Sequence, residues 1–449
     1  MKYQTGYDSF QYSDYFKTDL PEHWLEKRLG FLAKEERAAF VDGPFGSDLK
    51  SSEYKDSGVP LIQLNNIRDS KHLMQNMKFV TEDKKKELIR HLAIPGDVVI
   101  AKMADPVARS AIVANDFSEY VIVADCVKMT PDLNSVDLMY LVWSINCDHV
   151  RINAELVSTG TTRIRINLGE LKKLKIPYPP FEEQQKIANF LDHETAKIDT
   201  LIEKQQQLIK LLKEKRQAVI SHAVTKGLNP NAPMRESGVE WLGEVPEHWE
   251  VKRVRHAFQI DNNLRTPIDR QSRMEMVGDY RYYGPTGILN LIDRYNVDGE
   301  YFLLGEDGDH FLKFKEKAMT IHVGGQFNVN NHAHLIKGKG TCSTKWGCLY
   351  FEHKDLFPWL IKQGVGRYKL QKTVLSDIPI AVPPASEQEC ILNGVSKKKL
   401  VFARIESRAQ SLILTLQERR TALISAAVTG KIDVRNWQAP HKENKEATL

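Results

Sequence analysis

The chain is an internal duplication, and this constrains its fold more than any other feature of the sequence. The segment LPEHWLEKRLGFL, which begins at Leu20, recurs as VPEHWEVKRVRHAF from Val245. A second pair is longer, because residues 179–226 align without a gap on residues 383–430, with 18 identities in 48 positions. Chance identity at average composition is only about 6% per position. The chain is therefore built from two copies of one frame.

Two blocks without visible similarity, residues 31–159 and 257–363, lie between the repeated segments. The linker that joins the copies, residues 227–249, is rich in glycine and proline, which interrupt helices and strands. At about 150 residues per domain, the length corresponds to about three structural units. We predict an N-terminal block (1–160), a first long-helix region (161–227), a linker with the repeat start (228–248), a C-terminal block (249–364), a second long-helix region (365–431) and a tail (432–449).

The two repeated segments predict two long helices. No glycine or proline occurs in residues 181–225, and only Gly394 interrupts residues 385–429. Gly227 and Gly430 lie just past the last turn, where a left-handed helix cap is expected. Gly394 could mark a local kink.

Apolar residues in both helices follow a spacing typical of a coiled-coil stripe, interrupted at Gln205 and Lys215 and at their repeat mates. A helix of about 40 residues is about 60 Å long, which favours a paired rod over two core helices inside one globule. Since a duplicated chain places its copies about a pseudo-two-fold axis, we predict an antiparallel pair with a globular block at either end. The predicted coiled-coil core is Ile198, Leu201, Leu208, Leu212, Val219, Phe402, Ile405, Leu412, Leu416 and Leu423.

Both blocks alternate short apolar runs with turn signals, which is typical of compact domains rich in strand. The predicted fold class is therefore α+β (mixed α/β), with two globular strand-rich domains separated by two long antiparallel coiled-coil helices. The predicted strands lie in residues 59–67, 96–103, 110–116, 120–129, 319–325, 326–336 and 347–353, and the predicted helices in residues 138–146 and 356–362.

No motif supplies a catalytic centre. The loop GPFGSDLK at residues 43–50 lacks the spacing of a phosphate-binding P-loop. His332 and His334 offer two metal ligands on one strand face, without a third. The acidic residues of 305–310 fit a turn better than a catalytic carboxylate pair. We predict no catalytic residue and no metal site.

The composition neither requires nor excludes a nucleic-acid partner, but together with the sequence it disfavours a secreted, membrane-spanning or disulfide-rich protein. There are 63 Lys and Arg residues against 58 Asp and Glu, a net charge of +5, which permits a nucleic-acid partner without requiring one. The first residues lack the apolar core of a secretion signal, and no apolar run approaches the roughly 20 residues of a membrane span. The five cysteines are scattered and form no C-x-x-C pair. We expect a cytoplasmic protein without a disulfide framework or a thiolate zinc site.

Polar, basic and aromatic side chains gather at predicted loops and strand ends of both blocks. Such side chains contact phosphates and base edges, although a solvated basic surface is the alternative for any one of them. The candidate DNA contacts are Ser47, Lys50, Lys102, Arg109, Arg163, Arg165, Arg281, Tyr282, Tyr283, Thr286, Lys313, Lys315, Asn331, His332, Arg367 and Lys369.

The ordered set of repeated motifs resembles the DNA-specificity subunits of type I restriction-modification systems. The resemblance covers nearly the whole chain, and in that family two target-recognition domains are separated by two similar long-helix regions. The motifs that carry it are PEHW at 21–24 and 246–249, PP-x-x-EQ at 179–184 and 383–388, and the helix ends at 216–227 and 419–430.

The resemblance implies that each block is a target-recognition domain that reads one half of an asymmetric bipartite DNA site. It also implies that the helices set the gap and dock two modification subunits, which bind S-adenosylmethionine and methylate adenine. ATP and Mg²⁺ then belong to restriction subunits, which are ATP-dependent translocases and endonucleases, and this chain binds no cofactor. The expected partners are double-stranded DNA, two modification subunits and restriction subunits, with no membrane.

Two other functions stay open from the residues alone. A stand-alone DNA-binding or architectural protein would bind its site without any partner, and its coiled coil would be purely structural. An unrecognised nuclease or methyltransferase would turn over substrate by itself and would depend on His332 or Glu306.

Overall fold

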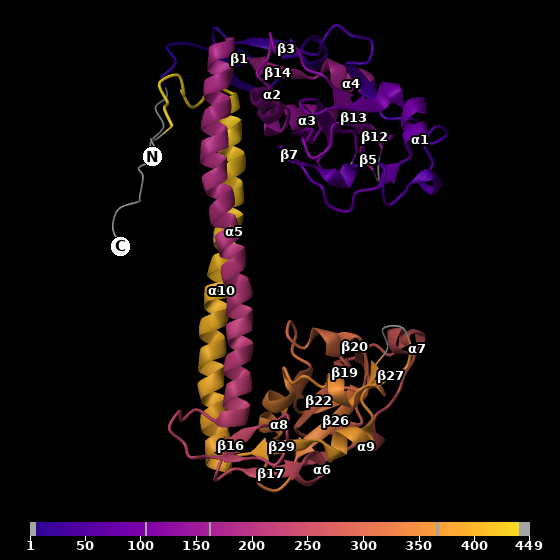
Figure 1. The fold of residues 1–449 in the computed structure, drawn as a ribbon. Helices are drawn as coiled ribbons and strands as arrows, with labels where there is room; N and C mark the ends of the chain where they lie inside the picture. The colour runs from indigo at the N-terminus through magenta and orange to yellow at the C-terminus, as the bar shows by residue number, and fades with distance from the viewer. Residues whose placement is uncertain (1–5, 104–105, 161–162, 365–367, 440–449) are drawn as a thin grey trace. The chain divides into compact units, whose positions relative to one another are not determined.

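The computed structural model describes residues 6–103, 106–160, 163–364 and 368–439. The chain divides into two compact units, which we call the first unit (Met1–Glu203 with Ile413–Leu449) and the second unit (Lys204–Leu412). Each unit contains one strand-rich block and part of each of two long helices (Figure 1). The six-segment division of the sequence stays a prediction.

The block of the first unit consists of two four-stranded sheets. One is antiparallel, with the strand order β11-β10-β13-β4, and the other has the order β8-β5-β12-β9, in which β5 and β12 run parallel. Along β10, Val98 and Ile100 belong to one apolar core while Val99 and Ala101 belong to another, so the strand is apolar at every position. The strands are β4 (Phe40–Asp42), β5 (Val59–Ile62), β8 (Phe79–Val80), β9 (Leu92–Ala93), β10 (Val98–Ala101), β11 (Ser110–Ile112), β12 (Tyr120–Ile122) and β13 (Cys126–Met129).

The block of the second unit also consists of two four-stranded sheets, in the orders β18-β26-β22-β24 and β20-β19-β25-β21. The first is antiparallel, and in the second β19 and β25 run parallel. In β22, Phe302 and Leu304 face one core and Leu303 faces another, as in β10. The strands are β18 (Phe258–Ile260), β19 (Tyr280–Gly284), β20 (Gly287–Ile292), β21 (Val297–Asp298), β22 (Tyr301–Gly305), β24 (Thr320–Val323), β25 (Gln326–Val329) and β26 (Ala333–Gly338).

The two blocks therefore share one topology, although their sequences do not visibly resemble each other. Every neighbouring strand pair in one block has a counterpart of the same direction in the other. The duplication that the sequence reveals in the frame extends, in the structure, into both blocks.

Short elements around the blocks are duplicated as well. In each copy a hairpin precedes the block, one strand before it pairs with one strand after it, and a helix covers the antiparallel sheet. These elements are β1 (Phe10–Ser13), β2 (Thr18–Pro21), β3 (Leu25–Arg28), β14 (Lys175–Tyr178), α2 (Leu138–Ile145) and α4 (Leu168–Lys173) in the first unit, and β15 (Met234–Glu236), β16 (Glu244–Pro246), β17 (Glu250–Arg253), β29 (Pro379–Val382), α8 (Thr344–Phe351) and α9 (Lys372–Asp377) in the second. The helix α6 (Val254–Ala257) follows β17 where a 3-10 turn, Leu29–Phe31, follows β3. Elements without a counterpart of the same kind are α1 (Glu82–Glu87), α3 (Asp148–Leu156), β6 (Ile67–Arg68), β7 (Lys71–His72) and α7 (Arg270–Glu275). The strands β23 (Asp307–Gly308), β27 (Ile361–Lys362) and β28 (Tyr368–Lys369) correspond to isolated bridges of Arg165 with Met103 and Thr159 in the first unit.

Both predicted long helices are present, α5 over Phe181–Lys226 and α10 over Ala385–Val428. In the first unit Asp199 of α5 pairs with Arg420 of α10, and in the second unit Lys213 pairs with Glu406. Because the start of each helix lies against the end of the other, the helix halves run antiparallel within each unit. Helix α10 continues through Gly394, where an added Cβ would lie 2.8 Å from Leu228 Cδ1, so this glycine makes room for a side chain.

The interface between the helices follows a different register from the predicted stripe. Leu201, Leu208, Ile405 and Leu412 are 47%, 37%, 36% and 44% exposed, which corrects their assignment to the core. Ala409, which the sequence suggested as an interruption, is 4% exposed. The buried or half-buried positions repeat at the same shift of 204 residues: Ile198, Ile202, Gln205, Ile209, Leu212, Arg216 and Val219 on α5, and Phe402, Glu406, Ala409, Ile413, Leu416, Arg420 and Leu423 on α10.

The structure corrects two further assignments and confirms a third. Residues 347–353, predicted as a strand, lie mostly in α8, because a short apolar run that is buried all round has no period to separate helix from strand. Residues 356–362, predicted as a helix, form a single 3-10 turn followed by β27. The helix predicted in residues 138–146 is α2.

Candidate nucleic-acid interface

A single carboxylate joins the N-terminal block to the first long helix. Glu183, in the first turn of α5, accepts hydrogen bonds from the Tyr7 hydroxyl at 2.9 Å and from the Trp24 indole N–H at 3.1 Å. His23 Nε2 lies 2.7 Å from the same carboxylate, and Trp24 is 1% exposed. Burial, and then the charge of Glu183, raises the pKa of Tyr7 above its usual range, so the hydroxyl remains a donor.

We call the contact of a PEHW histidine and tryptophan with the first-turn glutamate of a long helix a joint. The second unit contains the same joint. Glu387, in the first turn of α10, accepts a hydrogen bond from the Trp249 indole N–H at 3.0 Å, and His248 Nε2 lies 2.7 Å from it. The PEHW motif therefore recurs because its histidine and tryptophan hold the first turn of a long helix.

The glutamine after each of these glutamates holds the block itself. Gln184 Oε1 accepts a hydrogen bond from the backbone N–H of Asp137, the N-cap of α2, at 2.9 Å. Gln388 Oε1 accepts the corresponding bond from Ser343, the N-cap of α8, at 2.9 Å. Both glutamines are almost fully buried. The EQ pair is thus a structural connection in both copies.

Each joint also receives the end of the other long helix. Gly430 has a φ of +73°, and an added Cβ would lie 2.4 Å from Pro21 Cγ. Gly227 has a φ of +75°, and an added Cβ would lie 3.3 Å from Trp249 Cζ2. Glycine is required at both positions, because a side chain would be strained in the left-handed region and crowded by the joint.

Helices of the first unit also contact the N-terminal block through charged groups. Asp199 of α5 accepts hydrogen bonds from Lys71 Nζ and from Arg420 Nε, each at 3.0 Å. The Arg420 guanidinium lies 5.5 Å from the centre of the Trp143 ring. These contacts hold the β6–β7 hairpin and α2 against the helix pair.

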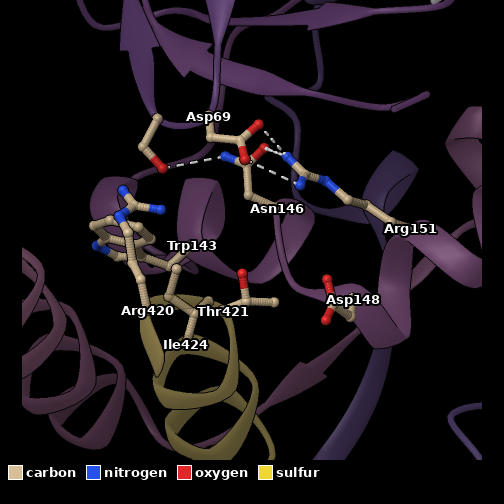
Figure 2. A pocket seen from close by; sticks show the side chains of 9 residues that line it. Asp69, Trp143, Asn146, Asp148, Arg151, Arg420, Thr421 and Ile424 are labelled. Carbon is tan, nitrogen blue, oxygen red and sulfur yellow. Dashed lines mark hydrogen bonds and ion pairs between the residues drawn. The ribbon is translucent and has the colours of Figure 1, made fainter. Parts of the chain in front are cut away.

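The hollow beside Arg420 is part of this contact and not a ligand site. Figure 2 shows Arg151 reaching across to Asp69 and Asn146, with hydrogen bonds of 2.5 to 3.1 Å. The hollow has a volume of about 20 Å³, which is room for about one water molecule.

In the N-terminal block the candidate DNA contacts separate into exposed and buried groups. Ser47, Lys50 and Arg163 are exposed, and Arg165 is exposed but pairs with Asp125 at 3.2 Å. Lys102 and Arg109 are only 4% and 7% exposed, which corrects their assignment to the surface. Lys102 Nζ lies 2.8 Å from Asp42, and Arg109 donates a hydrogen bond to the carbonyl of Leu64 at 3.4 Å.

In the C-terminal block the candidate aromatic contacts are core residues. Tyr282 and Tyr283 are 0% and 6% exposed, and the Tyr282 hydroxyl donates a hydrogen bond to the carbonyl of Thr266 at 2.8 Å. Both tyrosines thus pack inside the block, and Tyr282 also lines a cleft beside the turn 330–332. Lys369 is half-buried against Glu306, and Arg367 lies outside the described residues. The remaining candidates are exposed: Arg281, Thr286, Lys313, Lys315, Asn331 and His332.

Backbone hydrogen bonds give a residue-by-residue match between the two blocks. The N–H of Lys102 donates to the carbonyl of Asp125, and the N–H of Glu306 donates to that of His332, at 2.9 and 2.8 Å. The carbonyls of Lys102 and Glu306 in turn accept from residues 166 and 370, which are repeat mates. Lys102 thus corresponds to Glu306, and the turn at Asp125 to the turn at His332.

The buried ion pair at this equivalent position has opposite polarity in the two blocks. Lys102 pairs with Asp42 in the first, whereas Glu306 pairs with Arg265 and, at 3.1 Å, with Lys369 in the second. Burial raises the pKa of the Glu306 carboxyl, but the bond from Arg265, the nearby His334 and the bond from Lys369 together hold the pKa below its usual value. No feature of the sequence indicated Arg265 as a partner of this glutamate.

A cleft opens beside the turn that contains His332. It has a volume of about 590 Å³, and segment 267–269, Arg273, Leu289 and the turn 330–332 line it. Tyr282 also lines the cleft, and of all the lining residues only Tyr282, Asn331 and His332 are among the candidate DNA contacts from the sequence.

The part of the chain that the structure describes contains neither a metal-binding cluster nor a membrane-spanning helix. No group of three or more His, Cys, Asp or Glu side chains there could hold a metal ion. None of the helices described is long and apolar enough to span a membrane.

Comparison with known protein families decides the family of the chain. Residues 47–211 and 246–409 match the type I restriction modification DNA specificity domain, which is most of the chain. The chain belongs to this family. The first matched segment includes most of the N-terminal block and part of α5, and the second includes the whole C-terminal block and part of α10.

Specificity subunits of type I restriction enzymes are similar to the chain over different shares of their length. The EcoKI specificity subunit of Escherichia coli K12 is 28% identical over 427 residues, or 88% of each chain. S.HindORF215P of Haemophilus influenzae is 32% identical over 139 residues, which are 31% of this chain and 34% of that one. The MjaX specificity subunit of Methanocaldococcus jannaschii is 24% identical, and the match covers 52% of it. The chain thus spans about half or less of the length of these last two relatives.

A solved structure agrees with the fold. A chain from a structure of complex assembly and conformational transition in a type I R-M system superposes with a TM-score of 0.66. The superposition covers 92% of this chain and 99% of that one at 12% sequence identity. The predicted fold class of two strand-rich blocks and two long helices is confirmed.

Proposed function

We propose that this chain is the DNA-specificity subunit of a type I restriction-modification complex, and that each block reads one half of an asymmetric bipartite site. The observation that carries the proposal is that two blocks of unlike sequence share one topology and one duplicated joint. A shared scaffold presents its loops in the same way, whereas different loop residues contact different bases. Exposed lysines and arginines at the flanks hold phosphates, so affinity is expected to fall steeply with salt.

The long helices set the number of base pairs between the half-sites in this proposal. Helix α5 has 46 residues and α10 has 44, which correspond to about 69 and 66 Å of continuous helix. Half-sites about 34 Å apart lie on the same face of DNA. A gap that is fixed by helix length is constant for one chain.

Docking of modification subunits on the outer faces of residues 183–223 and 387–427 is the second part of the proposal. In the second unit Leu211, Leu400 and Val401 are 60%, 71% and 56% exposed. Large apolar side chains that remain exposed on a helix surface support an interface with another protein. Because the frame is duplicated, two modification subunits are expected.

The chain itself performs no chemistry in this proposal. The modification subunits bind S-adenosylmethionine and methylate adenine after flipping it from the stack, and the restriction subunits use ATP and Mg²⁺. The complex acts in the cytoplasm, where its substrate is double-stranded DNA.

A base-resolution methylome of the native host, with and without this chain, tests the proposal. We expect one bipartite adenine-methylation motif to disappear with the chain and to return when the chain is supplied again. A methylome that is unchanged in a host whose modification subunits are active contradicts the proposal.

Exchange of residues 31–159 for the same block of another family member tests the division of labour. We expect one half of the methylated motif to change while the other half stays the same. Changes in both halves would show that the blocks do not read their half-sites independently.

A further inference from the structure

The turn at residues 330–332 presents two polar side chains to the cleft of the C-terminal block. His332 is half exposed, and the Asn331 carboxamide makes no hydrogen bond to any residue that the structure describes. Arg273 lies in the same cleft wall and supplies a positive charge. A cleft of about 590 Å³ with polar side chains at its edge admits the edge of a base and is too large to be a packing defect.

The carboxylate of Asp307 fixes which nitrogen of His332 carries the proton. His332 Nδ1 lies 2.9 and 2.8 Å from the two oxygens of Asp307. A carboxylate only accepts hydrogen bonds, so Nδ1 must carry the proton that it donates. In the neutral ring Nε2 is then an acceptor, and no described residue occupies it.

A buried network keeps the turn in one position. Arg265 donates hydrogen bonds to the carbonyls of Asn331 and Ala333, at 3.0 and 3.3 Å, and pairs with Glu306. The N–H of His332 donates to the Asn330 side chain at 2.9 Å. Since the backbone is held from both sides, His332 and Asn331 are presented at a defined place in the cleft.

The equivalent turn in the N-terminal block has different chemistry. Asp125 takes the place of His332, and Arg165 neutralises it at 3.2 Å. The same scaffold thus presents an imidazole in one block and an ion-paired carboxylate in the other. Because the two half-sites differ in sequence, the two blocks are expected to present different side chains at this equivalent turn.

We propose that the cleft takes the edge of one base pair of the second half-site, and that His332 reads an exocyclic amine there, adenine N6 or cytosine N4. Asp307 is the positioning residue that makes Nε2 an acceptor. In the major groove adenine and cytosine present amine donors, whereas guanine and thymine present oxygen acceptors. This inference rests on the proposed function, in which the C-terminal block reads DNA.

The test compares Asp307→Asn, His332→Ala and the matched control Asp309→Asn in the chain assembled with its modification subunits. Asp309 is an exposed carboxylate of the same loop, 64% accessible, that pairs with Lys313. The measurement is the base preference at every position of a DNA library whose second half-site is randomised. Thermal melting of each variant establishes that it is folded.

We expect the unmodified chain to prefer adenine or cytosine about 10-fold or more at one position, from the discrimination typical of one direct base contact. His332→Ala removes this preference. Asp307→Asn replaces a group that only accepts hydrogen bonds by an amide that accepts and donates, so the proton is no longer confined to Nδ1 and the preference for adenine or cytosine at that position becomes weaker. Asp309→Asn leaves the profile unchanged.

Two outcomes overturn the inference while leaving the proposed function intact. One is that Asp307→Asn or His332→Ala weakens binding equally for all sequences, which is what a phosphate contact or a purely structural role gives. The other is that the position sensitive to His332 prefers guanine or thymine in the unmodified chain. If exchange of the whole C-terminal block leaves the second half-site unchanged, the proposed function itself fails.

Discussion

At the scale of single residues, the two glutamates that begin the long helices explain the motifs that recur in the sequence. Glu183 and Glu387 each accept an indole N–H from a tryptophan that is 1% exposed. A buried donor that loses its acceptor is costly, so glutamate and tryptophan must be kept together in both copies.

Replacement of Glu183 by alanine should destabilise the first unit. The Trp24 indole N–H and the Tyr7 hydroxyl lose a charged acceptor, and the free energy of unfolding should fall by about 3 kcal/mol. Chemical denaturation followed by tryptophan fluorescence measures the loss. Glu182→Ala is the control, because this exposed residue of the same turn should change stability by less than about 0.5 kcal/mol. Equal losses would show that the joint does not depend on this carboxylate.

At the scale of elements, the interface between the helices depends on a choice between two registers. The predicted core and the observed one share Ile198, Leu212 and Val219, whereas Gln205, a predicted interruption, is half-buried in the observed one. Neighbouring residues of a helix point about 100° apart, so Leu201 and Ile202 both fit an apolar stripe. Packing against the second helix buries Ile202 more than Leu201.

Alanine substitutions at Leu412 and Leu416 distinguish the two registers. Leu416 is 6% exposed, and its truncation should cost about 2 to 4 kcal/mol of unfolding free energy. Leu412 is 44% exposed, and its truncation should cost less than about 0.5 kcal/mol in the isolated chain. Denaturant midpoints of the two variants provide the measurement. A larger loss at Leu412 would restore the register predicted from the sequence.

At the scale of the whole molecule, the proposed function requires that the length of the two helices sets the number of base pairs between the half-sites. Asp199 pairs with Arg420 in the first unit, and Lys213 pairs with Glu406 in the second. Residues between these pairs can be removed in units of seven without changing the face that each helix presents to the other.

Deletion of both Lys204–Lys210 and Ala409–Thr415 should shorten the gap of the recognised site. Seven residues of helix correspond to about 10 Å, which is about three base pairs of DNA. We expect a methylated motif with unchanged half-sites and a gap shorter by about three base pairs in the methylome. Deletion from one helix only is the control, because it breaks the pairing and should abolish methylation. A gap that stays constant in the double deletion would contradict the measuring role.

The duplication and the two long helices can be predicted from the amino-acid sequence, which also shows the recurrence of the motifs PEHW and PP-x-x-EQ without showing that their side chains meet. These features depend on local propensity and on side chains that recur at a constant shift, as Trp24 and Trp249 do, and both are visible without a fold. The helical register was only half determined, because Leu201 and Ile202 satisfy the same local pattern.

Which side chains reach the surface depends on how the strands and helices pack, and it cannot be predicted from the sequence. Tyr282 and His332 were equal candidates, yet the sheet buries the tyrosine and the turn exposes the histidine. Likewise Lys102 and Glu306 occupy one equivalent place through backbone bonds to segments far away in the chain. Burial and pairing of this kind arise from contacts between distant segments, and no local pattern of residues encodes them.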